Sequence, residues 1–234
     1  MVSIITIDGP SGAGKSTVSL GLANLLGYTY VDSGALYRIV ALEALRKKIA
    51  EENENALVNL CKNLEVTFRT AKGKIKILNH GLDVSEYIRS PEISMLASRL
   101  SAKKAVRDQI TALQRKMGEK GKLVLEGRDA GTVVFPEAEV KFFLDATPEE
   151  RGKRRFKELT LQGLSTSLEQ VTQDIITRDH NDSTRSHAPL KPAPDAVIIN
   201  SSAMTVNEVI ARMMAIIQAK KKLGGKNEWI KVKR

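Results

Sequence analysis

A glycine-rich loop near the start of the chain constrains the fold more than any other feature of this sequence. Gly9-Pro-Ser-Gly-Ala-Gly-Lys15-Ser16 fits the pattern G-x-x-x-x-G-K-[ST]. An apolar run typical of a buried strand, residues 3–7, precedes it, and residues 15–26 follow with apolar side chains at helical spacing. Gly27 stands where a left-handed helix cap is expected. The chain therefore opens with a strand, a phosphate-binding loop (P-loop) and a helix.

The P-loop predicts a site for the phosphates of a nucleotide. Its glycines let backbone N–H groups point at the β-phosphate, and the helix N-terminus adds a dipole that favours anions. We expect Lys15 to bridge the β- and γ-phosphates and Ser16 to place its hydroxyl on Mg²⁺. The residues expected to bind the nucleotide are Gly9, Pro10, Ser11, Gly12, Ala13, Gly14, Lys15, Ser16 and Thr17.

Four further apolar runs predict an α/β fold with a five-stranded parallel sheet in a three-layer arrangement. They span residues 28–31, 123–125, 140–144 and 197–199, and polar or glycine residues and then a helical pattern follow each. Capping boxes independently mark three helix starts, at Thr147-Pro-Glu-Glu150, Ser167-Leu-Glu-Gln170 and Thr205-Val-Asn-Glu208.

Residues 64–88 break this pattern and predict a small antiparallel insert. Val66 and Phe68 are expected to oppose Ile75 and Ile77 across a turn near residues 72–73.

Charge and composition exclude several classes of protein. The net charge is +10, but residues 219–234 carry seven Lys and Arg against one Glu, so the body is only mildly basic. With 4% aromatic residues, a dedicated RNA-binding platform is not expected. The single cysteine, Cys61, excludes an internal disulfide, and the three histidines lack metal-ligand spacing.

No apolar run is long enough for a membrane span, because polar residues interrupt even residues 206–219. Residues 2–7 are assigned to a buried strand that leads into the P-loop, so they are not expected to act as a signal sequence. We therefore expect a cytoplasmic protein, and a monomer.

Two further motifs follow predicted strands. Asp32-Ser-Gly-Ala-Leu-Tyr-Arg38 comes after the second strand, and Glu126-Gly-Arg-Asp129 after the third. Both are expected at the carboxyl edge of the sheet, where open α/β folds bind ligands. A structural ion pair is the alternative for Arg128 and Asp129. The Asn-Lys-x-Asp motif of guanine-specific switches does not occur.

At this point the chain resembles the bacterial-type cytidylate kinases, within the nucleoside monophosphate kinases. The resemblance rests on both motifs, on the P-loop, on Gly131-Thr-Val-Val-Phe-Pro136, and on Arg178-Asp-x-x-Asp-Ser-x-Arg185 with Ala188-Pro-Leu190. It covers nearly all of residues 1–218. It implies a kinase core (1–63, 89–148 and 164–218), a monophosphate-binding insert (64–88), a short helical lid (149–163) and a basic tail (219–234).

The resemblance also implies the reaction ATP + (d)CMP = ADP + (d)CDP with Mg²⁺, and it assigns roles to individual residues. Arg38 and Arg128 hold the acceptor phosphate with support from Ser33. Ser98, Arg107 and Asp129 read the cytosine ring, and Asp182 with Arg178 and Arg185 meets the ribose and phosphates. Lys15, Arg128, Arg151, Arg155 and Arg178 form the implied catalytic set.

Physical chemistry supports the base and lid assignments. Cytosine donates from its N4 amino group and accepts at N3, which suits a carboxylate at Asp129 and a guanidinium at Arg107, and uracil reverses both. Arg107 could instead be a solvated helical charge. Arg151 and Arg155 stand four apart on a predicted helix, with Arg154 beside them, so we expect them to face inward over ATP. A solvated face paired with neighbouring glutamates is the alternative.

Two other functions stay open. Another small P-loop kinase, acting on uridylate, adenylate or a non-nucleotide metabolite, would share Lys15 and the lid, and Asp129 and Arg107 discriminate against it. A nucleotide-dependent RNA-binding protein could use the P-loop as a sensor and residues 219–234 as an electrostatic arm.

Overall fold

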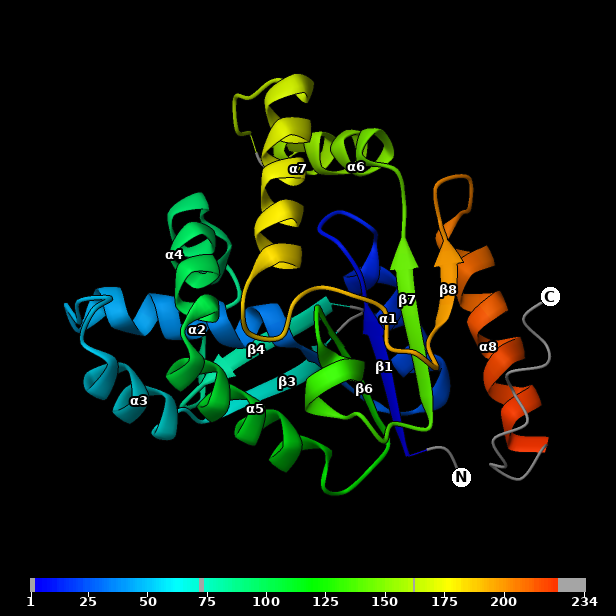
Figure 1. Cartoon of the computed structure of the whole chain (residues 1–234), viewed down its shortest axis with the longest axis horizontal. Helices are drawn as coiled ribbons and strands as arrows, with labels where there is room; N and C mark the ends of the chain where they lie inside the picture. The colour runs from blue at the N-terminus through cyan, green and yellow to red at the C-terminus, as the bar shows by residue number, and fades with distance from the viewer. Residues whose placement is uncertain (1–2, 72–73, 162, 223–234) are drawn as a thin grey trace. The chain divides into compact units, whose positions relative to one another are not determined.

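The computed structural model describes residues 3–71, 74–161 and 163–222 (Figure 1). The chain forms two compact units, which we describe separately. Unit 1 comprises Met1–Tyr30 and Gly121–Arg234, and unit 2 comprises Val31–Lys120.

A five-stranded sheet forms the centre of unit 1. Its strands are β1 (Ile4–Asp8), β2 (Thr29–Asp32), β6 (Leu123–Gly127), β7 (Val140–Asp145) and β8 (Val197–Asn200), in the order β2-β6-β1-β7-β8. β1 lies in the middle, with Ile5 in parallel register with Val124 on one side and Val140 on the other. Covered faces explain why these strands read as continuous apolar runs instead of alternating ones. The predicted α/β fold and five-stranded sheet are confirmed.

The helices of unit 1 begin where local signals predict. They are α1 (Lys15–Leu26), α6 (Pro148–Leu161), α7 (Leu168–Thr184) and α8 (Val206–Lys222). Gly27 ends α1 in the left-handed region at φ 67°. The Thr205 hydroxyl accepts from the N–H of Glu208, and the Glu208 carboxylate accepts from Thr205 N–H at 2.7 Å, which completes a capping box. α8 continues to Lys222, so residues 219–222 of the predicted tail are helical, and 223–234 lie outside the described residues.

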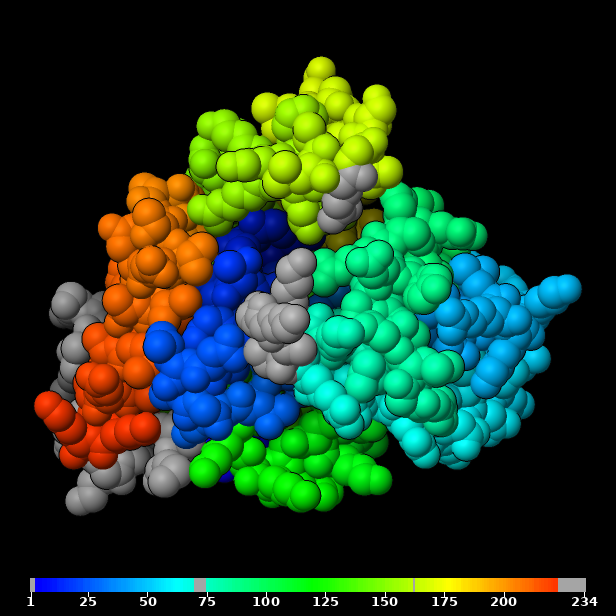
Figure 2. Space-filling model, turned by 180° about the vertical axis from the view of Figure 1, so that it is seen from behind, coloured from blue at the N-terminus to red at the C-terminus, as the bar shows by residue number. Residues whose placement is uncertain are grey.

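α1 and α8 pack against one another, as Figure 2 shows for the blue helix and its orange-red neighbour. Gly21 permits this approach, because a Cβ there would lie 2.6 Å from Cδ1 of Ile210.

The described part of unit 2 combines four helices with a small antiparallel sheet. The helices are α2 (Ser33–Arg46), α3 (Glu54–Lys62), α4 (Pro91–Ala102) and α5 (Lys104–Gly118), with a 3₁₀ turn, η1 (Tyr87–Arg89). The sheet consists of β3 (Val66–Ala71), β4 (Lys74–Asn79) and β5 (Leu82–Asp83). The antiparallel insert is therefore confirmed.

The strand register differs in one detail from the predicted pairing. Phe68 opposes Ile77, but Val66 opposes Asn79 instead of Ile75, because antiparallel partners run in opposite directions from the shared turn. The predicted turn at residues 72–73 lies outside the described residues. His80 and Gly81, both at positive φ, form the turn between β4 and β5.

Among the residues that the structure describes, no helix is long and apolar enough to cross a membrane.

Candidate functional site

The P-loop of unit 1 curls through backbone conformations that its glycines make accessible. Gly12 and Gly14 adopt φ of 75° and 90°. A Cβ on Gly9 would lie 2.0 Å from the carbonyl oxygen of Leu144, the neighbouring strand residue. A side chain at position 9 would clash with this carbonyl, so glycine is what lets the loop pass this close to β7.

Lys15 is buried at the start of α1, with its Nζ donating to the carbonyl of Pro10 at 2.7 Å. The pKa of this ammonium is lowered from 10.5 to about 7, mainly by burial and also by the cations Arg128 and Arg178, against the opposing effects of Glu126 and Asp8. The positive charges of Lys15, Arg128 and Arg178, which come from separate segments, therefore lie close enough to interact. Together they favour the binding of an anion of high charge.

The arginines of α6 lie against the P-loop. Arg151 is buried and donates to the carbonyls of Ala146 at 2.8 Å and of Ser11 at 2.9 Å. Arg154 donates to the carbonyls of Ala13 at 3.3 Å and of Ser201 at 2.6 Å. Arg155 instead pairs with Glu158 on its own helix at 2.7 Å.

The prediction that Arg151 and Arg155 both face inward is therefore wrong for Arg155. Arg154, and not Arg155, lies with Arg151 against the P-loop. The reason is local, because Glu158, three residues further along α6, offers Arg155 a carboxylate on the same helix.

A carboxylate, Asp179 of α7, interacts with the same groups that a phosphate would use. It forms an ion pair with Arg151 and accepts from the backbone N–H of Ser11 at 3.3 Å. The donors at this loop therefore already bind an anionic oxygen, as a triphosphate site requires.

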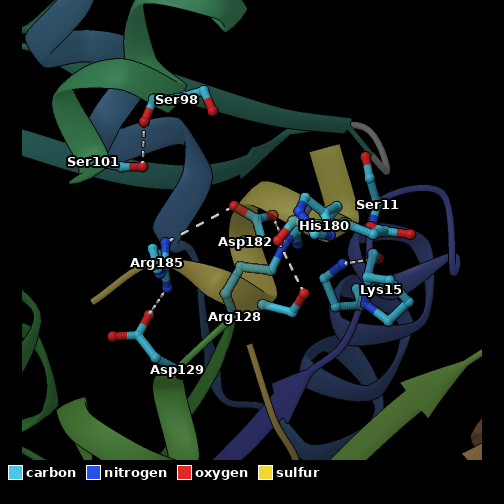
Figure 3. A network of polar contacts seen from close by, with 12 residues as sticks. Ser11, Lys15, Ser98, Ser101, Arg128, Asp129, His180, Asp182 and Arg185 are labelled. Carbon is cyan, nitrogen blue, oxygen red and sulfur yellow. Dashed lines mark hydrogen bonds and ion pairs between the residues drawn. The ribbon is translucent and has the colours of Figure 1, made fainter. Parts of the chain in front are cut away.

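Four charged side chains form a network beside the P-loop lysine (Figure 3). Arg128 donates to Asp182 at 2.8 Å, and Arg185 lies 3.8 Å from Asp129 and 3.9 Å from Asp182. Burial by itself raises the pKa of Asp182, but Arg128, Arg178 and Arg185 outweigh it and hold that pKa below its ordinary value. The structure therefore brings together Arg128, Asp129, Asp182 and Arg185, four of the residues that the sequence singled out.

Unit 2 holds the other predicted acceptor residues. Ser33 is buried and accepts from Nε2 of Gln114 at 2.7 Å, and Arg38 pairs with Asp32 at 2.7 Å. Asp32 also accepts from the N–H of Ala35 and so caps α2.

Arg107 and Ser98 lie on the helices α5 and α4 of the same unit. Arg107 is 4% exposed, donates to the carbonyl of Ser101 at 3.0 Å and lies over the ring of Tyr37. The carbonyl of Ser98 accepts from the Ser101 hydroxyl at 2.8 Å. A solvated charge, the alternative reading of Arg107, does not describe this buried guanidinium.

A divalent cation fits this site only together with a nucleotide. Ser16 is exposed at the first turn of α1 and supplies one hydroxyl, and Thr17 beside it is also exposed. In the described part of the chain no group of three or more His, Cys, Asp or Glu side chains could hold a metal ion. A single oxygen from the protein is enough for Mg²⁺, because this ion usually takes its other ligands from water and from the phosphates of the nucleotide.

Sequence reasoning missed several residues that shape the site. Asp8, Asp179, Ser201 and Gln114 contact predicted site residues or the loops that carry them. Two of them lay in visible patterns: Asp8 ends a buried strand, where a carboxylate needs partners, and Asp179 stands inside the motif that begins at Arg178. The partners of Ser201 and Gln114 come from distant segments and leave no local pattern.

Comparisons with known proteins point to one family. The family model described as "Cytidylate kinase" matches residues 5–219. Among curated proteins, the cytidylate kinase of Syntrophotalea carbinolica is 52% identical over 92% of this chain and 91% of its own, and that of Geobacter sulfurreducens is 48% identical over 94% of each. Among solved structures, an uncharacterized protein from Eubacterium ventriosum covers 94% of this chain and 99% of its own, with a TM-score of 0.53 and 13% identity, which speaks for the fold alone.

Proposed function

The chain belongs to the cytidylate kinase family, and from that premise we propose that it transfers the γ-phosphate of ATP to CMP, and also to dCMP, to give ADP and the diphosphate. The observation that carries the proposal is the convergence of Lys15, Arg128 and Arg178 beside a carboxylate-arginine network in one unit. It supplies fixed positive charge for two phosphate groups and polar groups for a nucleoside.

Residues 9–17 bind ATP in this proposal, with Lys15 on the β- and γ-phosphates. When bound, Mg²⁺ on the Ser16 hydroxyl neutralises charge on the transferring group. Arg151, with Arg155 and the neighbouring Arg154, belongs to a lid of residues 149–163. A closed lid excludes water, which could otherwise accept the phosphoryl group.

Arg128 and Arg38 bind the acceptor phosphate, and Ser33 supports it. Asp129 accepts from the N4 amino group of cytosine, Arg107 donates to N3, and Ser98 assists. Asp182 and Arg185 bind the ribose, and Arg178 contributes charge at the phosphates. An ion pair that already holds Asp182 ionised supports its role as an acceptor for ribose hydroxyls.

Transfer proceeds in line, without a covalent phosphoenzyme. The transition state is loose, and its charge spreads over the equatorial oxygens, so alignment and neutralising cations carry most of the catalysis. The attacking oxygen belongs to a phosphate that is already anionic near neutral pH, so no dedicated general base is needed.

We further propose a cytoplasmic monomer that requires neither nucleic acid nor a membrane. Its core comprises residues 1–63, 89–148 and 164–218, its monophosphate-binding insert residues 64–88, and its basic tail residues 219–234.

The proposal is tested by measuring ADP release with Mg²⁺ and ATP against CMP, dCMP, UMP, AMP and GMP, with Lys15→Ala as the blank. CMP and dCMP are expected to turn over far better than the other acceptors, and the variant is expected to be inactive. If no monophosphate is phosphorylated, the acceptor site is misassigned. RNA binding that is lost on deletion of residues 219–234 would then favour a nucleotide-dependent sensor.

A further inference from the structure

The carboxylate of Asp8 lies buried next to the proposed site and has no part in the reaction as described. Asp8 ends β1, directly before the P-loop, and is 3% exposed. Its Oδ1 accepts from the N–H of Ala130 at 2.8 Å and its Oδ2 from the N–H of Gly131 at 2.7 Å. Each oxygen therefore holds one of the two backbone amides that follow Arg128 and Asp129.

The turn that carries Asp129 is fixed from its other end as well. Residues Ala130–Val134 form a π-helical turn, η2, in which the carbonyl of Asp129 accepts from the N–H groups of Val133 at 2.9 Å and Val134 at 3.2 Å. The backbone on both sides of Asp129 is thus hydrogen-bonded, by its own turn and by Asp8.

This turn packs closely against β1. A Cβ built on Gly131 would lie 2.7 Å from Oγ1 of Thr6 and 3.3 Å from Oδ2 of Asp8. Gly131 therefore sits directly on the strand, and the two hydrogen bonds determine how the turn is oriented there.

We propose that Asp8 is a positioning residue that holds Arg128 and Asp129 in the orientation that binds CMP, acting through the amides of Ala130 and Gly131. This inference rests on the proposed function of the pair. A carboxylate is required because it offers two anionic acceptors, one for each amide, whereas an asparagine side chain offers one acceptor and one donor.

Protonation of Asp8 would remove one of the two acceptors. Burial raises the pKa of Asp8 to about 6, against the lowering effect of the Gly131 and Ala130 amides. Asp129, in the turn, raises this pKa and Lys15, on α1, lowers it, while from β7 the stem of Lys141 packs 3.2 Å from the Cβ position of Gly131. As the pH falls through about 6, Asp8 becomes protonated and one of its two hydrogen bonds to the turn is lost. The KM for CMP is then expected to rise.

The test compares steady-state kinetics of the wild-type chain with Asp8→Asn and Asp8→Ala. Near neutral pH, Asp8→Asn is expected to raise the KM for CMP about tenfold, the factor for one lost hydrogen bond, and Asp8→Ala to raise it more. The KM for ATP should stay within about twofold, because the amides concerned do not belong to the P-loop. Asp145→Asn is the matched control, a strand-end aspartate that accepts from the N–H of Ala146 at 2.8 Å, and it should leave the KM for CMP unchanged.

A pH series separates positioning from general destabilisation. The ratio of the KM for CMP in Asp8→Asn to that in the wild type is expected to fall toward one between about pH 7.5 and 5.5, because the wild type then loses the same hydrogen bond. Titration of CMP itself cancels in the ratio. An unchanged KM for CMP in both Asp8 variants, equal losses for CMP and ATP, or a ratio that does not change with pH would overturn the inference.

Asp129→Asn is measured in parallel to distinguish a failure of the inference about Asp8 from a failure of the proposed acceptor site. If Asp129→Asn changes CMP selectivity and Asp8→Asn has no effect on CMP, the inference alone fails. If neither has an effect, the proposed acceptor site fails with it.

Discussion

Replacement of Lys15 by methionine should make the chain more stable while it abolishes phosphoryl transfer. Lys15 is 7% exposed, and its ammonium is removed from water on folding, where it donates to the carbonyl of Pro10. Arg128 and Arg178 add repulsion. A methionine side chain has a similar length and shape, so it can fill the same space without that penalty.

The size of the effect follows from the pKa shift. Folding lowers the pKa of Lys15 from 10.5 to about 7. Each pKa unit corresponds to about 1.4 kcal/mol, so burying this group at pH 7 costs about 4 kcal/mol. Loss of the hydrogen bond to Pro10 subtracts about 1 kcal/mol, which leaves a net gain of about 3 kcal/mol for Lys15→Met.

The sign of the pH dependence is fixed by the direction of the shift. Between pH 7 and 10.5 the unfolded chain binds the Lys15 proton and the folded chain does not, so wild-type stability rises with pH in this window. The advantage of Lys15→Met should therefore shrink as the pH is raised toward 10.5.

Urea unfolding without nucleotide, near pH 7 and again near pH 9.5, measures this difference in the free energy of unfolding. Lys153→Met is the matched control: it removes the same charge from an exposed position beside Glu150 on α6. It is expected to change stability by less than about 1 kcal/mol. A Lys15→Met variant that is less stable than the wild type, or whose gain is independent of pH, would refute the reasoning.

Three further outcomes are expected. Gly152→Ala should lower the free energy of unfolding by about 1–3 kcal/mol, because its Cβ would lie 2.2 Å from Oγ1 of Thr172, and Thr172→Ala should recover part of that loss in a urea titration of the double variant. The thiol of Cys61, whose pKa burial raises to about 12, should react with iodoacetamide only when urea unfolds the chain, and modification of the native chain would contradict this. Thr205→Ala should lower the melting temperature through a loss of about 1 kcal/mol, since it removes the side-chain cap of α8, and an unchanged melting temperature would show that the capping box contributes nothing.

The sequence predicted the elements whose causes are local. α1 begins at Lys15 and ends at Leu26 as the apolar spacing and Gly27 indicated, and all five strands of the sheet lie on predicted apolar runs. The π-helical turn Ala130–Val134 was not predicted, because two of its amides are held by Asp8, more than a hundred residues earlier in the chain. Interactions between distant segments override local propensity there.

The site likewise combines features with local causes and features that depend on the folded chain. Motifs singled out Lys15, Arg128 and Asp129 as candidates, because phosphate and base chemistry favour particular residue types at particular strand ends. The orientation of Arg155 was predicted wrongly, because helical spacing gives the face of α6 but not the choice between a loop carbonyl and a neighbouring glutamate. Which partner an arginine takes depends on distances that only the folded chain sets.

The claim that an acceptor site around Asp129 selects CMP is tested most directly by the ratio of kcat/KM for CMP to that for UMP. Two mismatched buried pairs, each worth about 1–3 kcal/mol, predict a wild-type ratio between about thirtyfold and about twenty-thousandfold. Asp129→Asn should lower the ratio by about tenfold or more, because an amide can turn its NH₂ toward the O4 of uracil. A ratio that is unchanged in Asp129→Asn would contradict the assignment of base recognition to this carboxylate.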